Sequence, residues 1–117
     1  MYPPAPPMPM AAASFAALVC RVFAAAGGRD PAFKRDVMRT YRLAQETFVR
    51  VKPPGRARFL DKYFVLHRIL QLKVSSEHLA LAPAIRDPAR FAADDRIWQR
   101  ICDACHWEYV PLQCGTA

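Results

Sequence analysis

The feature that most constrains the fold is the stretch between Asp30-Pro31 and Pro53-Pro54-Gly55. Aspartate can accept the free amide hydrogen bonds of a first helical turn, and proline fits that turn because its missing N–H costs nothing there. We therefore predict a helix from Pro31 to about Val51. Its apolar residues recur at steps of four and three, with charged residues on the opposite side. The apolar positions are Phe33, Val37, Tyr41, Ala44 and Phe48, and the charged ones are Arg35, Arg39, Arg42, Glu46 and Arg50. This helix has one face to bury and one basic face.

A second helix is predicted from about Arg58 to Lys73. Its apolar residues form two stripes that together cover most of the circumference, which is typical of a helix in the middle of a bundle. One stripe is Phe59, Tyr63, Leu66 and Leu70, and the other is Leu60, Phe64 and His67.

The C-terminal third contains two further helix signals. Ser75 can cap a short connector helix that ends before Pro83. Asp87-Pro88 repeats the cap-and-proline start, and it predicts a helix that runs to about His106. The inner stripe of this helix is Phe91, Trp98, Ile101, Cys102 and Cys105. Beyond it, apolar Trp107, Tyr109 and Val110 flank polar Glu108, which favours a short extended tail against the core.

The N-terminal part differs in composition. Residues 1–10 hold five of the eleven prolines and are predicted to be a flexible arm. Residues 11–28 are rich in alanine and could form an extra helix that stops at Gly27-Gly28, although the sequence leaves open whether it docks on the domain. We take residues 29–111 as the helical domain and residues 112–117 as a tail.

The fold class that follows is all-α: three main helices, a short connector helix, an extended C-terminal tail and a possible Ala-rich helix at the N-terminus. The sequence contains no apolar run of about 18 residues, so it predicts no membrane span. The expected core residues are Phe59, Tyr63, Leu66, Leu70, Phe91, Trp98, Ile101 and Trp107.

A zinc site is the first functional hypothesis that the residues raise. Cys102, Cys105, His106 and Cys114 could supply four ligands, but only the first half of this set has conventional spacing. Two cysteines three apart on the inner side of a helix also pack well as small apolar residues. We therefore predict packing for Cys102 and Cys105, no bound metal and no other cofactor, with a small zinc-binding module kept as an alternative.

Catalysis has no positive signal in this sequence. His67 shares a helix with Asp61, and His78 follows Glu77, but neither pair has a companion nucleophile. We expect His67 to be a half-buried packing residue and His78 to lie at the surface. Adjacent Asp94 and Asp95 point about 100° apart on a helix, so they would not share a proton or a metal. They are expected to balance Arg96 and Arg90, and we predict no enzymatic activity.

The charge is concentrated in one region. The formal net charge is +7, and twelve basic against four acidic residues lie between Arg29 and Lys73. Cations on one helix face can neutralise phosphates, whereas the aromatic residues of that helix lie on its core face and cannot stack on bases. The candidate nucleic-acid or partner-binding residues are Lys34, Arg35, Arg39, Arg42, Arg50, Lys52, Arg56 and Arg58. A merely solvated helix face, on a helical protein–protein adaptor with no nucleic-acid role, is the other interpretation.

The segment from Arg58 to Pro111 resembles a known family. A leucine-rich helix is followed by a connector and then by an ordered pattern made of Asp95, Ile97, Trp98, Ile101, Cys102, Trp107, Tyr109, Val110 and Pro111. This pattern is similar to the C-terminal portion of the viral late transcription factor 3-like proteins of poxviruses and of other large nucleocytoplasmic DNA viruses. Members of that family are generally longer and carry a cysteine-rich, zinc-binding N-terminal portion, whereas here only Cys20 precedes the helical domain.

The resemblance implies a non-enzymatic late-gene transcription factor module. Such a module would act with a viral RNA polymerase, or with other late transcription factors, on viral DNA. It would work inside an infected host cell, in a cytoplasmic virus factory or in the nucleus, with no membrane and no small-molecule substrate. DNA and an acidic polymerase surface are both open as the target of the basic residues.

Overall fold

The computed structural model of this chain describes residues 10–28, 30–83, 85 and 87–111, and their regular structure is entirely helical. The all-α prediction is therefore confirmed. The predicted arm at residues 1–10 lies outside the described residues except for Met10, and the tail at residues 112–117 lies outside them altogether. The elements are α1 (Met10–Ala25), α2 (Pro31–Val51), α3 (Lys62–Leu72), α4 (Ser76–Leu81), the 3₁₀ turn η1 (Pro88–Phe91) and α5 (Ala92–Cys105). None of these helices is long and apolar enough to cross a membrane.

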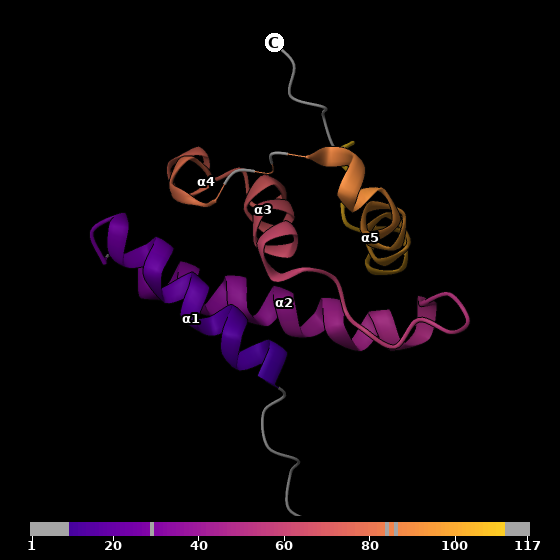
Figure 1. The fold of residues 1–117 in the computed structure, drawn as a ribbon. Coiled ribbons are helices and arrows are strands. Elements are labelled where there is room, and N and C mark those ends of the chain that lie inside the picture. Colours follow the sequence, from indigo (N-terminus) through magenta and orange to yellow (C-terminus); the bar gives the residue numbers. More distant parts are fainter. Residues whose placement is uncertain (1–9, 29, 84, 86, 112–117) are drawn as a thin grey trace, which may run out of the picture.

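Helix α2 organises the bundle, and it contacts α1, α3 and α5 (Figure 1). Its predicted start is confirmed, because the Asp30 carboxylate accepts a hydrogen bond from the Phe33 N–H at 3.3 Å and Pro31 occupies the first turn. The helix ends at Val51, just before Lys52 and the next prolines. Its predicted apolar face is buried at Val37, Tyr41, Ala44 and Phe48, with Phe33 packed against the edge of the core.

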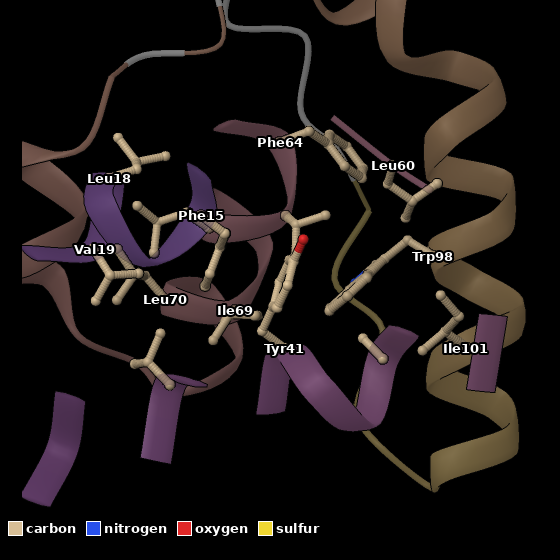
Figure 2. Packing of buried hydrophobic residues seen from close by; sticks show 14 of the residues in the cluster. Phe15, Leu18, Val19, Tyr41, Leu60, Phe64, Ile69, Leu70, Trp98 and Ile101 are labelled. Atoms are coloured by element: carbon tan, nitrogen blue, oxygen red, sulfur yellow. The ribbon is translucent and has the colours of Figure 1, made fainter. Parts of the chain in front are cut away.

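Helix α1 is part of the same core. The Phe15 ring lies stacked on the Tyr41 ring of α2, with centroids 3.8 Å apart and planes 10° apart (Figure 2). The other buried residues of α1 are Leu18, Val19, Val22 and Phe23. The sequence predicted this helix but left its docking open, and the structure answers that question: α1 packs on α2, α3 and α4.

Helix α3 begins four residues later than predicted, at Lys62 rather than at Arg58. The reason is a cap: the Asp61 carboxylate accepts hydrogen bonds from the Tyr63 and Phe64 N–H groups at 2.9 and 3.1 Å. The helix is buried over most of its circumference, as predicted. Tyr63 is the exception, since its 39% exposure contradicts its predicted place in the core. It lies on the same side as half-buried His67, four residues on, along the less buried edge of the helix.

The other expected core residues are inside to different degrees. Leu66, Leu70, Trp98 and Ile101 are buried, and Trp98 extends from α5 toward Tyr41 (Figure 2). Phe59, Phe91 and Trp107 are partly buried and pack against the edge of the cluster.

The connector helix α4 contains a buried histidine. His78 is 7% exposed and lies against the rings of Phe23 and Phe33, at centroid distances of 4.4 and 5.2 Å. Its Nδ1 is 2.8 Å from the Ser75 hydroxyl. Our prediction that His78 lies at the surface was wrong, because α1 and the start of α2 cover it.

The last helix is capped differently from the prediction. Asp87-Pro88 opens the 3₁₀ turn η1, in which the Asp87 side chain makes no capping bond, and the α-helix starts only at Ala92. At the other end His106 adopts a left-handed conformation with φ 59°, and the Trp107 N–H donates to the Cys102 carbonyl at 2.8 Å. This is a Schellman-type helix ending. Residues 107–111, where a short extended segment was predicted, follow without regular secondary structure.

The docking of α1 can be tested by changing Phe15 to alanine. Phe15 is 0% exposed and stacked on Tyr41, so its loss leaves a cavity. We expect a loss of about 3–5 kcal/mol in the free energy of unfolding, measured by urea denaturation. Val49→Ala is the control, because Val49 is 67% exposed and its change should stay within about 0.5 kcal/mol. Equal small effects of both changes would show that α1 is not packed in the core.

Candidate nucleic-acid interface and the ion pairs behind it

The basic face of α2 is defined by Lys34, Arg35, Arg39, Arg42 and Arg50. The four arginines are exposed and Lys34 is half-buried. Among the residues that the structure describes, none of these five side chains pairs with a carboxylate; Arg50 contacts only the hydroxyl of Thr47 on its own helix, at 3.5 Å. The first four border an open hollow of about 560 Å³ together with Pro31 and Met38. The cations therefore stand side by side and free to meet an anion.

The loop that follows α2 divides the three remaining candidates. Lys52 and Arg58 are exposed. Arg56 turns inward instead: its guanidinium lies 2.8 Å from the Asp94 carboxylate of α5 and donates to the Arg58 carbonyl at 2.7 Å. The other Asp94 oxygen accepts the Asp61 N–H at 3.1 Å. Arg56 thus fixes the loop and the start of α3 to α5, a structural task that the sequence did not reveal.

A second arginine, Arg68 of α3, is almost completely buried at 2% exposure. One of its terminal nitrogens lies 3.1 Å from the Asp95 carboxylate and donates to the Val110 carbonyl, and the other donates to Gln71 at 2.8 Å. The Tyr109 hydroxyl donates to the second Asp95 oxygen. The Arg68 network, as we call these groups, joins α3, α5 and the C-terminal tail.

These two ion pairs correct the prediction for the adjacent aspartates. Asp94 balances Arg56 and Asp95 balances Arg68, not Arg96 and Arg90. The burial of Arg68 was not predicted, because a single arginine beside Leu66, Ile69 and Leu70 is usually taken to face solvent. The available signal was its placement in a helix that is apolar on nearly every side, since a charge in such a helix needs a buried partner.

Burial shifts the proton affinities of the groups around the network. Burial lowers the pKa of the Arg68 guanidinium, and the nearby Asp95 charge opposes that shift. Arg68 remains charged, since arginine is not deprotonated in proteins. Burial, and then the Arg68 charge, lower the pKa of neighbouring His67. Burial also raises the pKa of the Tyr109 hydroxyl, helped by its hydrogen bond to Asp95.

The cysteines of the zinc hypothesis occupy different surroundings. Cys102 is buried in the core, and burial raises the pKa of its thiol to about 12. The Cys105 sulfur lies 3.2 Å from the Thr47 hydroxyl of α2. His106 is exposed at the end of α5, and Cys114 lies outside the described residues. Within residues 10–28, 30–83, 85 and 87–111 no three potential metal ligands form a cluster.

Fold and surface together define a small all-α protein whose longest helix buries one side and displays cations on the other. The chain belongs to the family described as Poxvirus Late Transcription Factor VLTF3 like, whose family model matches residues 32–109. The resemblance seen from Arg58 to Pro111 is thereby confirmed, and the match extends it through nearly all of α2. The basic face lies inside the part of the chain that the family shares.

Two relatives come from large DNA viruses. A protein of Paramecium bursaria Chlorella virus 1, named as a "putative transcription factor", is 35% identical over 66 residues, which are 56% of this chain and 18% of that protein. A protein of Acanthamoeba polyphaga mimivirus, also named as a "putative transcription factor", is 30% identical over 87 residues, 71% of this chain and 20% of that protein. The chain thus aligns with about a fifth of the length of either relative. No solved structure matches it significantly.

The Arg68 network can be tested by unfolding. Arg68→Met leaves the Asp95 charge without its partner, and we expect the free energy of unfolding to fall by roughly 3–5 kcal/mol. Adding Asp95→Asn removes the stranded charge, so part of that loss should return.

The matched control for this experiment is Lys73→Met. It breaks the more exposed pair between Lys73 and Asp36, whose side chains are 26% and 40% exposed. Its cost should stay below about 1 kcal/mol. If Arg68→Met is as mild as Lys73→Met, or if the two changes at Arg68 and Asp95 simply add, the network does not hold the helices together.

Proposed function

We propose that this chain is a late-gene transcription factor module that meets viral DNA through the basic face of α2. The observation that supports the proposal is the row of exposed cations without carboxylate partners among the described residues. Ion pairs with Asp94 and Asp95 tie the partly buried Arg56 and the buried Arg68 to α5, whereas the α2 cations have no comparable structural task. Lys52 and Arg58, which are exposed in the loop after α2, would add further contacts.

The contact would be made with phosphates. Arg35 to Arg50 spans about 22 Å of helix at a rise of roughly 1.5 Å per residue, enough to reach several phosphates of a duplex. Guanidinium groups present donors in a planar fork that fits phosphate oxygens. Phosphate contacts fix position and orientation but carry no sequence information. The module would therefore hold DNA, and promoter choice would come from elsewhere.

The family and the relatives support a setting for this module. We infer that the module works in infected cells with a viral RNA polymerase or with other late transcription factors, in a virus factory or in the nucleus. The names of the chlorella virus and mimivirus relatives as transcription factors support this setting. Because the chain aligns with only about a fifth of those proteins, the proposal concerns this module and not their whole activity.

Duplex binding across a salt series tests the proposal. The affinity of the unchanged protein should fall steeply with salt, with a log–log slope of about −0.9 per neutralised phosphate. The triple change Arg35→Glu, Arg39→Glu and Arg42→Glu should make that slope shallower by about 2–3, because three phosphate contacts are lost.

A matched control uses single reversals. Arg39→Glu and Arg21→Glu change the net charge equally, and both positions are exposed on helices, but Arg21 lies on α1. Only Arg39→Glu should weaken binding strongly. Equal effects of the two changes would mean that net charge and not the α2 face attracts DNA. Binding that neither salt nor the triple change alters would contradict the proposal and favour a protein partner.

A further inference from the structure

A second surface lies beside α5, and none of the residues that line it belongs to α2. It is an open hollow of about 520 Å³, lined by Arg96, Gln99, Arg100, Asp103, Trp107 and Tyr109. We call it the aromatic hollow. Its four α5 residues are exposed, and its two aromatic residues are half-buried.

The aromatic side of the hollow is held in place. The Trp107 ring packs on buried Trp98, with centroids 5.9 Å apart, and the Tyr109 ring lies against the Arg68 guanidinium at 5.3 Å. The Tyr109 hydroxyl donates to Asp95. The left-handed turn at His106 brings the chain back so that these residues flank α5. A fixed aromatic surface loses little conformational freedom when a flat ligand stacks on it.

The polar side of the hollow offers both donors and an acceptor. Arg96, Gln99, Arg100 and Asp103 stand at positions i, i+3, i+4 and i+7, so they share one side of α5. Arg100 also donates to the Val51 carbonyl at 3.4 Å, which places it at the end of α2. Two guanidinium groups favour an anionic strand, while an amide and a carboxylate match the mixed donors and acceptors of a base edge better than phosphate alone.

We propose that the aromatic hollow binds an unpaired nucleobase of a single strand, stacked on Trp107 with its edge toward the polar residues of α5. Unpaired bases are recognised by stacking on aromatic or guanidinium planes and by hydrogen bonds to their exposed edges. The base in a closed duplex is not available in this way. This site is separate from the basic face of α2, and it supplies the stacking surface that α2 itself lacks.

The test compares strands that differ only in their bases. Oligodeoxythymidylate should bind more tightly than an abasic strand of equal length and charge, and it should quench tryptophan fluorescence. Trp107→Ala should weaken binding of the base-containing strand about 5-fold or more, which is the range for loss of one stacked base. Binding of the abasic strand should not change. Oligouridylate in the same assay distinguishes an RNA source of the base from a DNA source, and binding of either strand supports the site.

Trp107→Phe guards against a merely structural effect. This variant keeps an aromatic surface, so it should retain affinity for the base-containing strand while losing the fluorescence response. Arg96→Ala provides a second variant that leaves the aromatic packing intact, and it should also weaken the base-dependent binding. Equal affinities for the base-containing and abasic strands, or unchanged affinity in both Trp107→Ala and Arg96→Ala, overturn the proposal.

The outcome separates this site from the proposed function. The triple change on α2 should weaken duplex binding but preserve the difference between base-containing and abasic strands. If the unchanged protein does not bind duplex DNA but still binds the base-containing strand more tightly than the abasic strand, the α2 proposal alone is overturned. Salt-sensitive duplex binding with no base-dependent difference would overturn the aromatic hollow alone.

Discussion

The ion pair between the buried Arg68 guanidinium and Asp95 is the interaction on which the C-terminal half of the fold depends. A charge in an apolar interior is tolerated only when partners replace its water, and here Asp95, Gln71 and the Val110 carbonyl do so at the two terminal nitrogens. These partners come from α5, from α3 itself and from the tail, so α5 and the tail have to sit where the guanidinium can reach them. Trp107 and Tyr109 are placed as a consequence.

The amphipathic character of α2 organises the rest. Its apolar face is shared by α1, α3 and α5, which leaves its arginines no carboxylate partner among the described residues. Arg56 differs from these arginines, because its guanidinium forms an ion pair with Asp94 of α5. The contrast between Arg56 and the exposed α2 arginines supports a role in binding. It also separates Arg56 from the other seven candidate residues, although all eight were predicted from the sequence as one group.

Local signals made the helices predictable, whereas partners distant in sequence were not. Asp30-Pro31 and the apolar spacing of α2 predicted its bounds, because capping and periodicity act within a few residues. The start of α3 was predicted too early because the sequence permits a helix to begin either at Arg58 or just after Asp61. The hydrogen bonds that Asp61 accepts fix the start at Lys62. The burial of His78 and the pairing of Asp95 with Arg68 depend on elements separated along the chain. Periodicity carries no information about them, and the aromatic hollow was missed for the same reason.

We propose that the exposed face of α2 is where this module meets DNA. Backbone amide NMR shifts, recorded during titration with a short duplex, test it most directly because they report the location of contact in the intact fold. We expect the largest changes from Lys34 to Lys52 and at Arg58, with little change in α4, on the other side of α3 from α5 (Figure 1). Changes concentrated in α1 and α4, with no change in α2, would contradict a DNA contact at this face.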